Sequence, residues 1–315
     1  MSAPSTTRTR PPAAAPAGGS ARRPQVPRTL WFAVPAMLFL LYFFAYPLGV
    51  LLDLSFRQVS LGTAVRGERP FVGLDQYREL FASDVFWSSL PRTFIFVTVT
   101  VAIEIVVGFL IALMLSERTR FSGGVRGLIF FAWLLPPVVV GAVFGSFMGG
   151  TRAGVLNHVL LNLGVIDQPV VWLVNPTIGI ITLILLTAWS GTPFVVLIML
   201  AALRGVSPDL YEAAAIDGAT AVKKVRYITI PQIWPTVSIL ILLQIIYVYK
   251  TFEVILVVTG GGPGRSTATL PFLAYLKAFA ENDFGASAAY GTVGVLIATA
   301  ISVPYLITIR RKEAQ

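Results

Sequence analysis

The 315-residue sequence contains no cysteine and only one histidine, His158. Without cysteine the chain can form neither a disulfide nor a thiolate metal site. A single histidine also leaves no His-based catalytic pair and too few ligands for a histidine metal cluster. We therefore expect no metal site and no catalytic residues in this chain, and we interpret His158 as an ordinary loop residue.

Charged residues are scarce as well, at 12% of the sequence, whereas hydrophobic residues reach 56% and the mean hydropathy is +0.78. A soluble globule cannot cover its surface with this composition, so the sequence indicates a membrane protein. A membrane-spanning helix takes roughly 20 apolar residues, so a chain of this length has room for several spans.

The first 28 residues consist mainly of proline, alanine, serine and arginine, with almost no large apolar side chain. Such a segment cannot bury enough surface to order itself, so we predict that residues 1–28 form a disordered cytoplasmic tail. A cleaved signal peptide is the competing interpretation, but the apolar run that follows is too long for a signal-peptide core. We interpret that run as a retained first span.

Six apolar runs follow the tail, and each is long enough to cross about 30 Å of hydrocarbon as a helix. Helices are expected because backbone polar groups inside a bilayer must be paired within their own segment. The sequence therefore predicts an all-α membrane protein with six transmembrane helices in one domain, residues 29–315. The predicted spans are residues 31–52, 93–115, 128–148, 178–203, 236–258 and 290–309.

The distribution of lysine and arginine predicts the orientation of these spans. Fifteen of these residues fall on the side that holds both termini and eight on the other side, with Lys250 inside a span. The positive-inside rule therefore places both termini in the cytoplasm. The same asymmetry explains the formal net charge of +9 without a nucleic-acid partner.

Three ionisable residues, Glu104, Lys250 and Glu253, lie at membrane depth. A charge at the bilayer centre costs about 2.5 to 3.5 kcal/mol, so these side chains should face a partner or a wet cavity. Lys250 and Glu253 are three residues apart and can pair on one helical face, either to fix packing or to line a translocation path. For that path we name Glu104, Trp189, Tyr247, Lys250 and Glu253, because aromatic faces with a few hydrogen-bonding groups suit a sugar or polyol.

The segment between the fourth and fifth runs carries signals for two short helices. Ser207 is a suitable N-cap, and Pro208 fits the first helical position. Gly218 allows the chain to leave the first helix, and Thr220 can cap a second helix that Pro231 is expected to end. We predict a cytoplasmic helix-turn-helix between spans 4 and 5, where an amphipathic helix can enter a groove of a soluble partner.

This segment, residues 207–231, contains Glu212-Ala-Ala-Ala-Ile-Asp-Gly218 followed by Ile228-Thr-Ile-Pro231. The pattern resembles the EAA loop of the integral membrane subunits of bacterial ABC importers. That motif normally ends Ile-x-Leu-Pro, and here Ile230 replaces the leucine while preserving an apolar side chain.

Three further segments are similar to the carbohydrate-uptake branch of that family, and the resemblance extends from about Trp31 to Ile309. They are Phe71-Val-Gly-Leu-Asp-Gln-Tyr77, Gly154-Val-Leu-Asn157 and Thr259-Gly-Gly-Gly-Pro263. The last of them is no phosphate-binding loop, because it lacks the Gly-Lys pair that such a loop requires. We therefore do not expect this chain to hydrolyse nucleotide.

The resemblance implies a permease subunit of the bacterial cytoplasmic (inner) membrane. It also implies four kinds of partner: membrane lipid, a second homologous permease subunit, two ATP-binding subunits and an extracytoplasmic substrate-binding protein. ATP is then bound by the partners, so no cofactor is expected in this chain. The implied ATPase-coupling residues are Glu212, Ala213, Ala214, Asp217, Gly218, Ile228 and Pro231.

Two other classes of function stay open. An ion-coupled secondary transporter would use Glu104, Lys250 and Glu253 as a relay and would often show an internal repeat, which inspection of the sequence does not find. A membrane-embedded enzyme would need a nucleophile and a base on facing helices, which the lone histidine disfavours. Within the importer class, the sequence leaves a disaccharide, a monosaccharide, a polyol and glycerol 3-phosphate as alternatives for the cargo.

Overall fold

The structure is a computed structural model that describes residues 29–116 and 122–313. Within these two stretches every regular element is a helix, and strand-like pairing is limited to two isolated bridges. The predicted all-α class is therefore confirmed. The predicted tail, residues 1–28, lies outside the described residues.

The chain divides into two compact units, residues 1–48 and 49–315, which are described separately. In the first unit, α1 (Thr29–Leu40) continues through a π-helical turn, η1 (Leu41–Ala45), into the start of α2 (Tyr46–Ser55). Pro47 has no N–H to donate to the carbonyl four residues earlier, and the helix widens at this place.

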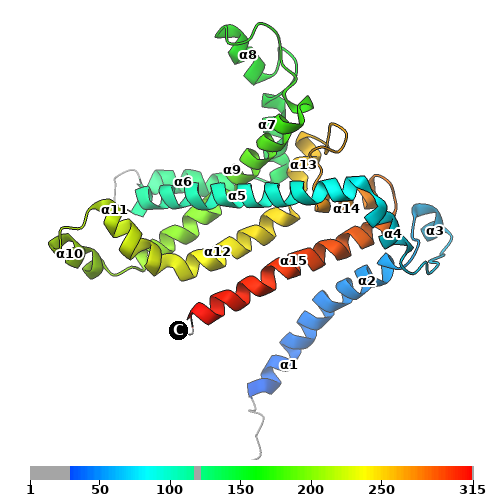
Figure 1. The fold of residues 1–315 in the computed structure, drawn as a ribbon, viewed down its shortest axis with the longest axis horizontal. Coiled ribbons are helices and arrows are strands. Elements are labelled where there is room, and N and C mark those ends of the chain that lie inside the picture. Colours follow the sequence, from blue (N-terminus) through cyan, green and yellow to red (C-terminus); the bar gives the residue numbers. More distant parts are fainter. Residues whose placement is uncertain (1–28, 117–121, 314–315) are drawn as a thin grey trace, which may run out of the picture. The chain divides into compact units, whose positions relative to one another are not determined.

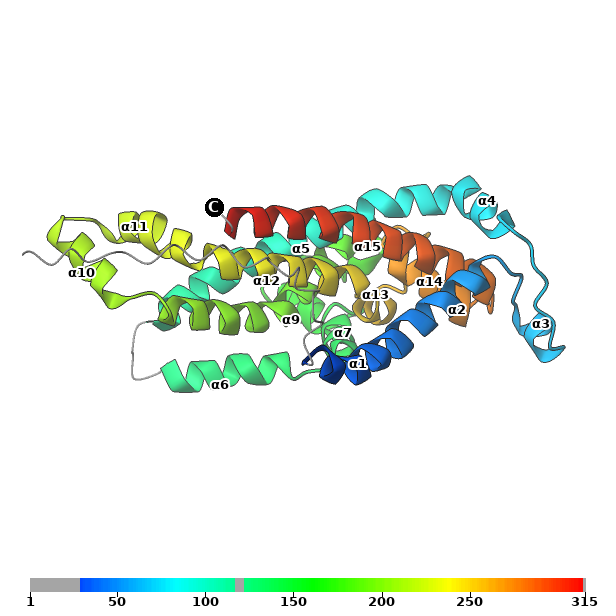
Figure 2. The same ribbon diagram turned by 90° about the horizontal axis from the view of Figure 1, so that it is seen from below.

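Four long helices make up the body of the second unit, and they lie alongside one another in both views (Figure 1, Figure 2). They are α5 (Asp84–Ser116), α9 (Pro176–Arg204), α12 (Ile230–Lys250) and α15 (Phe284–Glu313). Two clusters of buried apolar side chains join them, one of which also includes residues of α13 (Glu253–Val258) and α14 (Leu270–Phe279).

The register between α5 and α9 follows from two close contacts made by glycines. Gly108 of α5 lies against Val195 of α9, and Gly191 of α9 lies against Glu104 of α5. From the first contact to the second, the residue number rises by four in both helices, from Glu104 to Gly108 and from Gly191 to Val195. The two helices therefore run parallel. Each glycine lets the neighbouring helix approach closely, as is common between membrane helices.

The third predicted span, residues 128–148, is not one straight helix. α6 (Ser122–Trp133) and α7 (Pro137–Phe147) meet at an angle of 96°. Pro136 and Pro137 cause the break, because neither can donate a backbone hydrogen bond to the preceding turn. The described residues thus contain five helices that are long and apolar enough to cross a membrane, or six if the bent pair is one span.

Beyond α7 the chain forms α8 (Val155–Asn162) and a short 3-10 helix, η2 (Trp172–Val174). The buried Asn157 organises this segment, because its side-chain amide donates to the carbonyls of Gly149, Thr151 and Val170. The expectation that His158 lies in a loop was wrong, since this exposed residue belongs to α8.

Two further short helices and one loop lie, with α14, at one end of the four-helix body (Figure 1). α3 (Leu61–Val65) and α4 (Asp75–Ala82) precede α5, while the glycine-rich loop, residues 259–269, precedes α14. Thr93 of α5 accepts a 2.9 Å hydrogen bond from the Leu270 amide, and the Arg92 guanidinium donates to the carbonyl of Ala268. These contacts tie the start of α5 to this loop and to α14.

Candidate functional site

The segment between α9 and α12 forms α10 (Pro208–Ile216), a turn and α11 (Ala221–Lys224). Ser207 caps α10, because its hydroxyl accepts a hydrogen bond of 3.3 Å from the Asp209 amide. Gly218 adopts a φ of 75° after the helix, a conformation in which glycine carries no steric cost. Thr220 then accepts from the Lys223 amide and caps α11.

One hydrogen bond joins α10 to the residue that directly precedes α12. The hydroxyls of Tyr211 and Thr229 lie 2.9 Å apart, and Thr229 is buried. Figure 1 and Figure 2 both show α10 and α11 at one end of the four-helix body, opposite α4 and α14. The sequence analysis missed Tyr211, because a tyrosine one position before the glutamate carries no signal for a contact 18 residues away.

The second short helix does not stop at Pro231 as the sequence analysis expected. α11 passes into a π-helical turn, η3 (Val225–Thr229), and then directly into α12. Pro231 lies in the first turn of α12, where a missing N–H costs little. Residues 221–258 therefore form one candidate span that extends beyond the four-helix body.

Most of the residues that the resemblance implies for ATPase coupling are solvent-exposed in this chain. Glu212, Ala213, Asp217, Gly218 and Pro231 are exposed, whereas Ala214 and Ile228 are half-buried. Large apolar side chains accompany them: Ile216 is 88% exposed, Val222 76% and Tyr227 70%. We call the exposed residues Glu212, Ala213, Ile216 and Val222 the coupling patch, after the role that we propose for them in the next subsection. Large apolar side chains that are exposed together on a surface are typical of protein–protein contact sites.

A groove of about 310 Å³ opens between α6, α9 and α12. It combines three aromatic side chains with three non-aromatic residues that carry polar groups. Its lining residues are Trp133, Ser190, Gly191, Phe194, Leu243, Gln244, Ile246, Tyr247 and Lys250. Aromatic faces next to a few polar groups are the surroundings expected for a polyhydroxylated ligand.

The structure brings only two of the five predicted path residues, Tyr247 and Lys250, to the groove. Trp189 lies in α9, next to the groove residue Ser190, but packs its ring against Phe144, with 5.5 Å between ring centroids. Glu253 is separated from the groove by the break between α12 and α13.

The predicted pairing of Lys250 with Glu253 is also corrected by the structure. α12 ends at Lys250 and α13 begins at Glu253, so the two residues do not share a continuous helical face. The Lys250 ammonium lies 5.3 Å from the Tyr247 ring centroid, and the Glu253 carboxylate accepts from the Phe252 amide at 3.1 Å. Among the described residues, the two side chains form no ion pair with each other.

Glu104 lies behind the groove and is completely buried. Its Oε2 accepts a 2.6 Å hydrogen bond from Nε2 of Gln244, a groove residue of α12. The sequence analysis missed Gln244, although an amide side chain inside the apolar run 236–258 was a visible signal. A buried carboxylate thus connects α5 to the groove through one amide.

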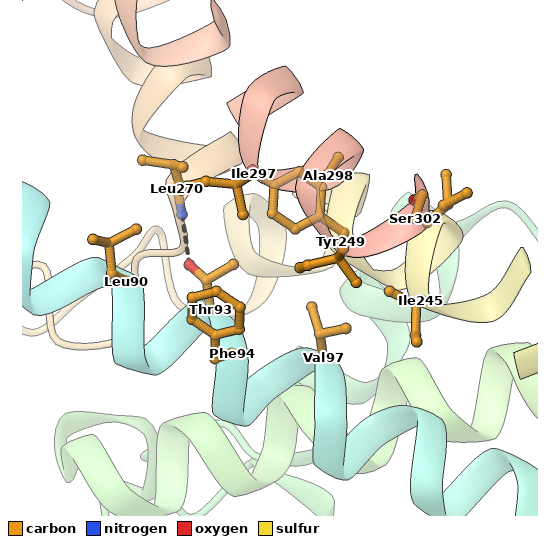
Figure 3. A pocket seen from close by; sticks show the side chains of 12 residues that line it. Leu90, Thr93, Phe94, Val97, Ile245, Tyr249, Leu270, Ile297, Ala298 and Ser302 are labelled. Atoms are coloured by element: carbon orange, nitrogen blue, oxygen red, sulfur yellow. Dashed lines mark hydrogen bonds between the residues drawn. The ribbon is translucent and has the colours of Figure 1, made fainter. Parts of the chain in front are cut away.

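A second cavity, between α5, α12, α14 and α15, has a different character. Figure 3 shows its lining, which is almost wholly apolar, including Leu90, Phe94, Val97 and Ile297. It encloses about 20 Å³, close to the space of a single water molecule. This cavity is a packing gap and cannot admit a solute of sugar size.

A polar pocket of about 160 Å³ lies at the end of the body that carries α4 and α14. Glu281, on its wall, receives a 2.6 Å hydrogen bond from Lys277 and a 3.3 Å contact from Arg265. The hydrogen bond from Lys277 is the main reason that the pKa of Glu281 falls below its ordinary value. The pocket therefore presents a fixed charge cluster at this end of the molecule.

Comparison with known proteins gives a consistent family. The model for the "binding-protein-dependent transport system inner membrane component" matches residues 104–312. The trehalose/maltose transport system permease MalF of Thermococcus litoralis is 33% identical over 239 residues, 76% of this chain and 80% of the relative. The sulfoquinovosyl glycerol permease SmoG of Agrobacterium fabrum is 29% identical, with 89% of each chain covered.

A bacterial ABC transporter that imports the polysaccharide alginate has a similar fold. One chain of that crystal structure matches with a TM-score of 0.77 at 24% identity, covering 90% of this chain and 96% of the other. A probable ABC transporter permease of Sinorhizobium fredii is 33% identical over 285 residues, 90% of this chain and 91% of the relative. The chain therefore belongs to the family of binding-protein-dependent transport system inner membrane components.

Proposed function

We propose that this chain is the membrane-spanning permease subunit of an ATP-driven importer for a carbohydrate or a related polyhydroxylated solute. The observation that carries the proposal is the continuous helix from α11 into α12, which joins the exposed coupling patch to the groove. The names of similar permeases support the cargo class, since they include trehalose/maltose, sulfoquinovosyl glycerol and diacetylchitobiose systems.

The proposed assembly contains a second permease subunit. The groove of this chain opens on one side, with Tyr247 and Trp133 both 42% exposed on its wall. A second permease placed against this side would complete a closed path, which one chain alone does not provide.

The other partners are two ATP-binding subunits and an extracytoplasmic binding protein. A solved alginate ABC transporter has been captured in complex with a periplasmic protein that carries an alginate pentasaccharide, which supports a binding-protein partner here. ATP would be bound by the partner subunits, and this chain would need no cofactor. The proposed orientation has both termini and the coupling patch in the cytoplasm, as the lysine and arginine distribution predicts.

In the proposed mechanism, closure of the ATP-binding subunits moves α10. Glu212 contacts the ATP-binding subunit and holds the patch against it. The Tyr211–Thr229 hydrogen bond transmits the movement of α10 to the N-terminal end of α12. Because α11, η3 and α12 are continuous, α12 then tilts and changes the opening of the groove. Binding energy on one side is thereby converted into alternating access on the other.

The geometry argues against the ion-coupled secondary transporter. Its relay would need Glu104, Lys250 and Glu253 to exchange an ion, but each of them has a different neighbour: Gln244, Tyr247 and the Phe252 amide. The family assignment supports the same conclusion, because the matched family is described as binding-protein-dependent and its relatives as transport-system permeases.

Reconstitution tests the proposal. The test uses vesicles that contain this chain, the second permease and the ATP-binding subunits, with the loaded binding protein on the extracytoplasmic side of the membrane. They should accumulate radiolabelled sugar only when ATP is present on the cytoplasmic side. Omitting any one component should abolish accumulation. Uptake by vesicles that contain this chain alone, driven by an ion gradient, would reject the importer and support the secondary transporter.

A further inference from the structure

Glu104 is unusual because a completely buried carboxylate here meets only one hydrogen-bond donor. Gln244 Nε2 binds Oε2 at 2.6 Å, whereas Oε1 has no hydrogen-bond partner among the described residues. Leaving a buried polar atom unpaired costs free energy, so the position needs an explanation beyond packing.

Gly191 explains how Oε1 is accommodated. A Cβ atom built on Gly191 would overlap Oε1 and would also approach Nε2 of Gln244 at 3.3 Å. Gly191 itself lines the groove. The absence of a side chain at this residue therefore makes room for the carboxylate and the amide together, directly behind the groove wall.

The bond to Glu104 fixes which atom Gln244 presents to the groove. An amide side chain carries two donor hydrogens on nitrogen and an acceptor oxygen. Glu104 accepts from the nitrogen, and Gln244 Oε1 receives no hydrogen bond from any described residue. Gln244 is only 2% exposed, yet it borders the groove, so it can offer little more than one atom.

Building on the proposed function, we propose that Glu104 is a positioning residue for cargo selectivity. It holds Gln244 so that the amide oxygen faces the groove and accepts a hydrogen bond from a hydroxyl of the passing solute. Tyr247 and Trp133 supply apolar faces beside this acceptor. The site thereby distinguishes a hydroxylated solute from its deoxy analogue.

Packing alone is the competing explanation, and the chain offers a matched control for it. Thr100 lies one helical turn from Glu104 in α5, is completely buried, and has a hydroxyl with no hydrogen-bond partner in the described structure. Replacing it by the isosteric valine removes a polar atom from the same interface without touching Gln244. Thr100→Val should therefore leave transport selectivity unchanged.

The functional test uses the complete complex, with trehalose, maltose and their deoxy analogues as probes and uptake expressed per assembled transporter. Glu104→Ala and Gln244→Ala should each lower the maximal rate about fivefold, the effect of one neutral hydrogen bond. Both should also lose the preference for the hydroxylated sugar. Glu104→Gln keeps an acceptor for the Gln244 amide and should stay within about twofold of the wild type.

A double variant distinguishes a positioning role of Glu104 from two independent effects on the transport rate. If Glu104 acts only through Gln244, the double variant Glu104→Ala/Gln244→Ala should transport as well as Gln244→Ala alone. A further loss of about fivefold in the double variant would overturn the proposal. Wild-type rates and selectivity in Glu104→Ala would overturn it too.

A cryo-electron microscopy map of the assembled Glu104→Ala complex decides the question without any cargo. The proposal predicts that the Gln244 amide turns away from its wild-type orientation, and that Thr100→Val leaves it in place. An unchanged amide in Glu104→Ala would refute the positioning role. If the wild type imports none of the probe sugars, trehalose and maltose are excluded as its cargo, while this map still tests the role of Glu104.

Discussion

The two carboxylates for which we propose functional roles have opposite surroundings. Glu212 is exposed in the coupling patch, where a soluble partner can reach it, whereas Glu104 is completely buried between α5, α9 and α12. The first belongs to a surface that we propose to contact another protein. The second belongs to an interior whose contacts are made within this chain, so the two regions should respond differently to substitution.

The largest effect on stability is expected at Gly191, where α9 packs directly against the Glu104 side chain. Gly191→Val places a branched side chain onto the Glu104 carboxylate and should destabilise the chain by about 3 kcal/mol or more. The measurement is the thermal unfolding midpoint in detergent, together with the yield of assembled complex. Gly145→Val is the matched control, because a Cβ at Gly145 meets nothing within 4 Å. Equal midpoints for the two variants would show that the Glu104 contact is not tight.

A smaller effect on stability, but a strong one on transport, is expected in the turn after α10. Gly218 has a φ of 75°, which a β-branched residue adopts only at a cost of about 1 to 2 kcal/mol. Gly218→Val should therefore distort the coupling patch and uncouple ATP hydrolysis from uptake. Gly218→Asn tolerates this conformation and should keep most activity. Wild-type uptake by Gly218→Val, measured in vesicles, would show that this turn is not needed for coupling.

The hydrogen bond that joins α10 to α12 should contribute about 1 kcal/mol. Tyr211→Phe removes it and should loosen α10, seen as faster hydrogen exchange of the α10 amides with little change in the global unfolding midpoint. Tyr227→Phe is the comparison, since Tyr227 is 70% exposed. Similar exchange rates in both variants would mean that the bond does not hold α10.

The smallest effect concerns the charge cluster around Glu281. Its pKa is lowered, chiefly by the hydrogen bond from Lys277, so the stabilisation is present above the ordinary value of 4.5 and is lost as pH falls through the lower folded value. Because the pair is exposed and screened by salt, about 0.5 kcal/mol or less is expected. Glu281→Gln should remove this acid dependence in melting curves, and an unaltered pH profile would contradict the assignment.

Local signals allowed much of the segment between α9 and α12 to be predicted. Ser207, Pro208, Gly218 and Thr220 act through neighbours within a few residues, and the structure gives them the capping and turn roles that their residue types favour. The predicted stop at Pro231 failed for a specific reason. A proline is compatible with the first turn of a helix, so the π-helical turn before it passes into α12 without a break.

The groove was harder to predict because its contacts join distant parts of the chain. Glu104 and Gln244 are 140 residues apart, and only the packing of α5, α9 and α12 brings them together. The break after Lys250 was not predicted either, so the three-residue spacing to Glu253 suggested a pairing that does not form. The length of an apolar run identifies a span but does not specify which helix faces meet.

The central claim is that the coupling patch contacts the ATP-binding subunit, and site-specific crosslinking tests it most directly. The chain has no cysteine, so one cysteine can be placed at Ala213 in the patch and another, in a separate variant, at the exposed Leu296 of α15. With a thiol-linked photocrosslinker in the assembled complex, Ala213→Cys should capture the ATP-binding subunit and Leu296→Cys should not. Capture from Leu296 alone, or from neither position, would contradict the account.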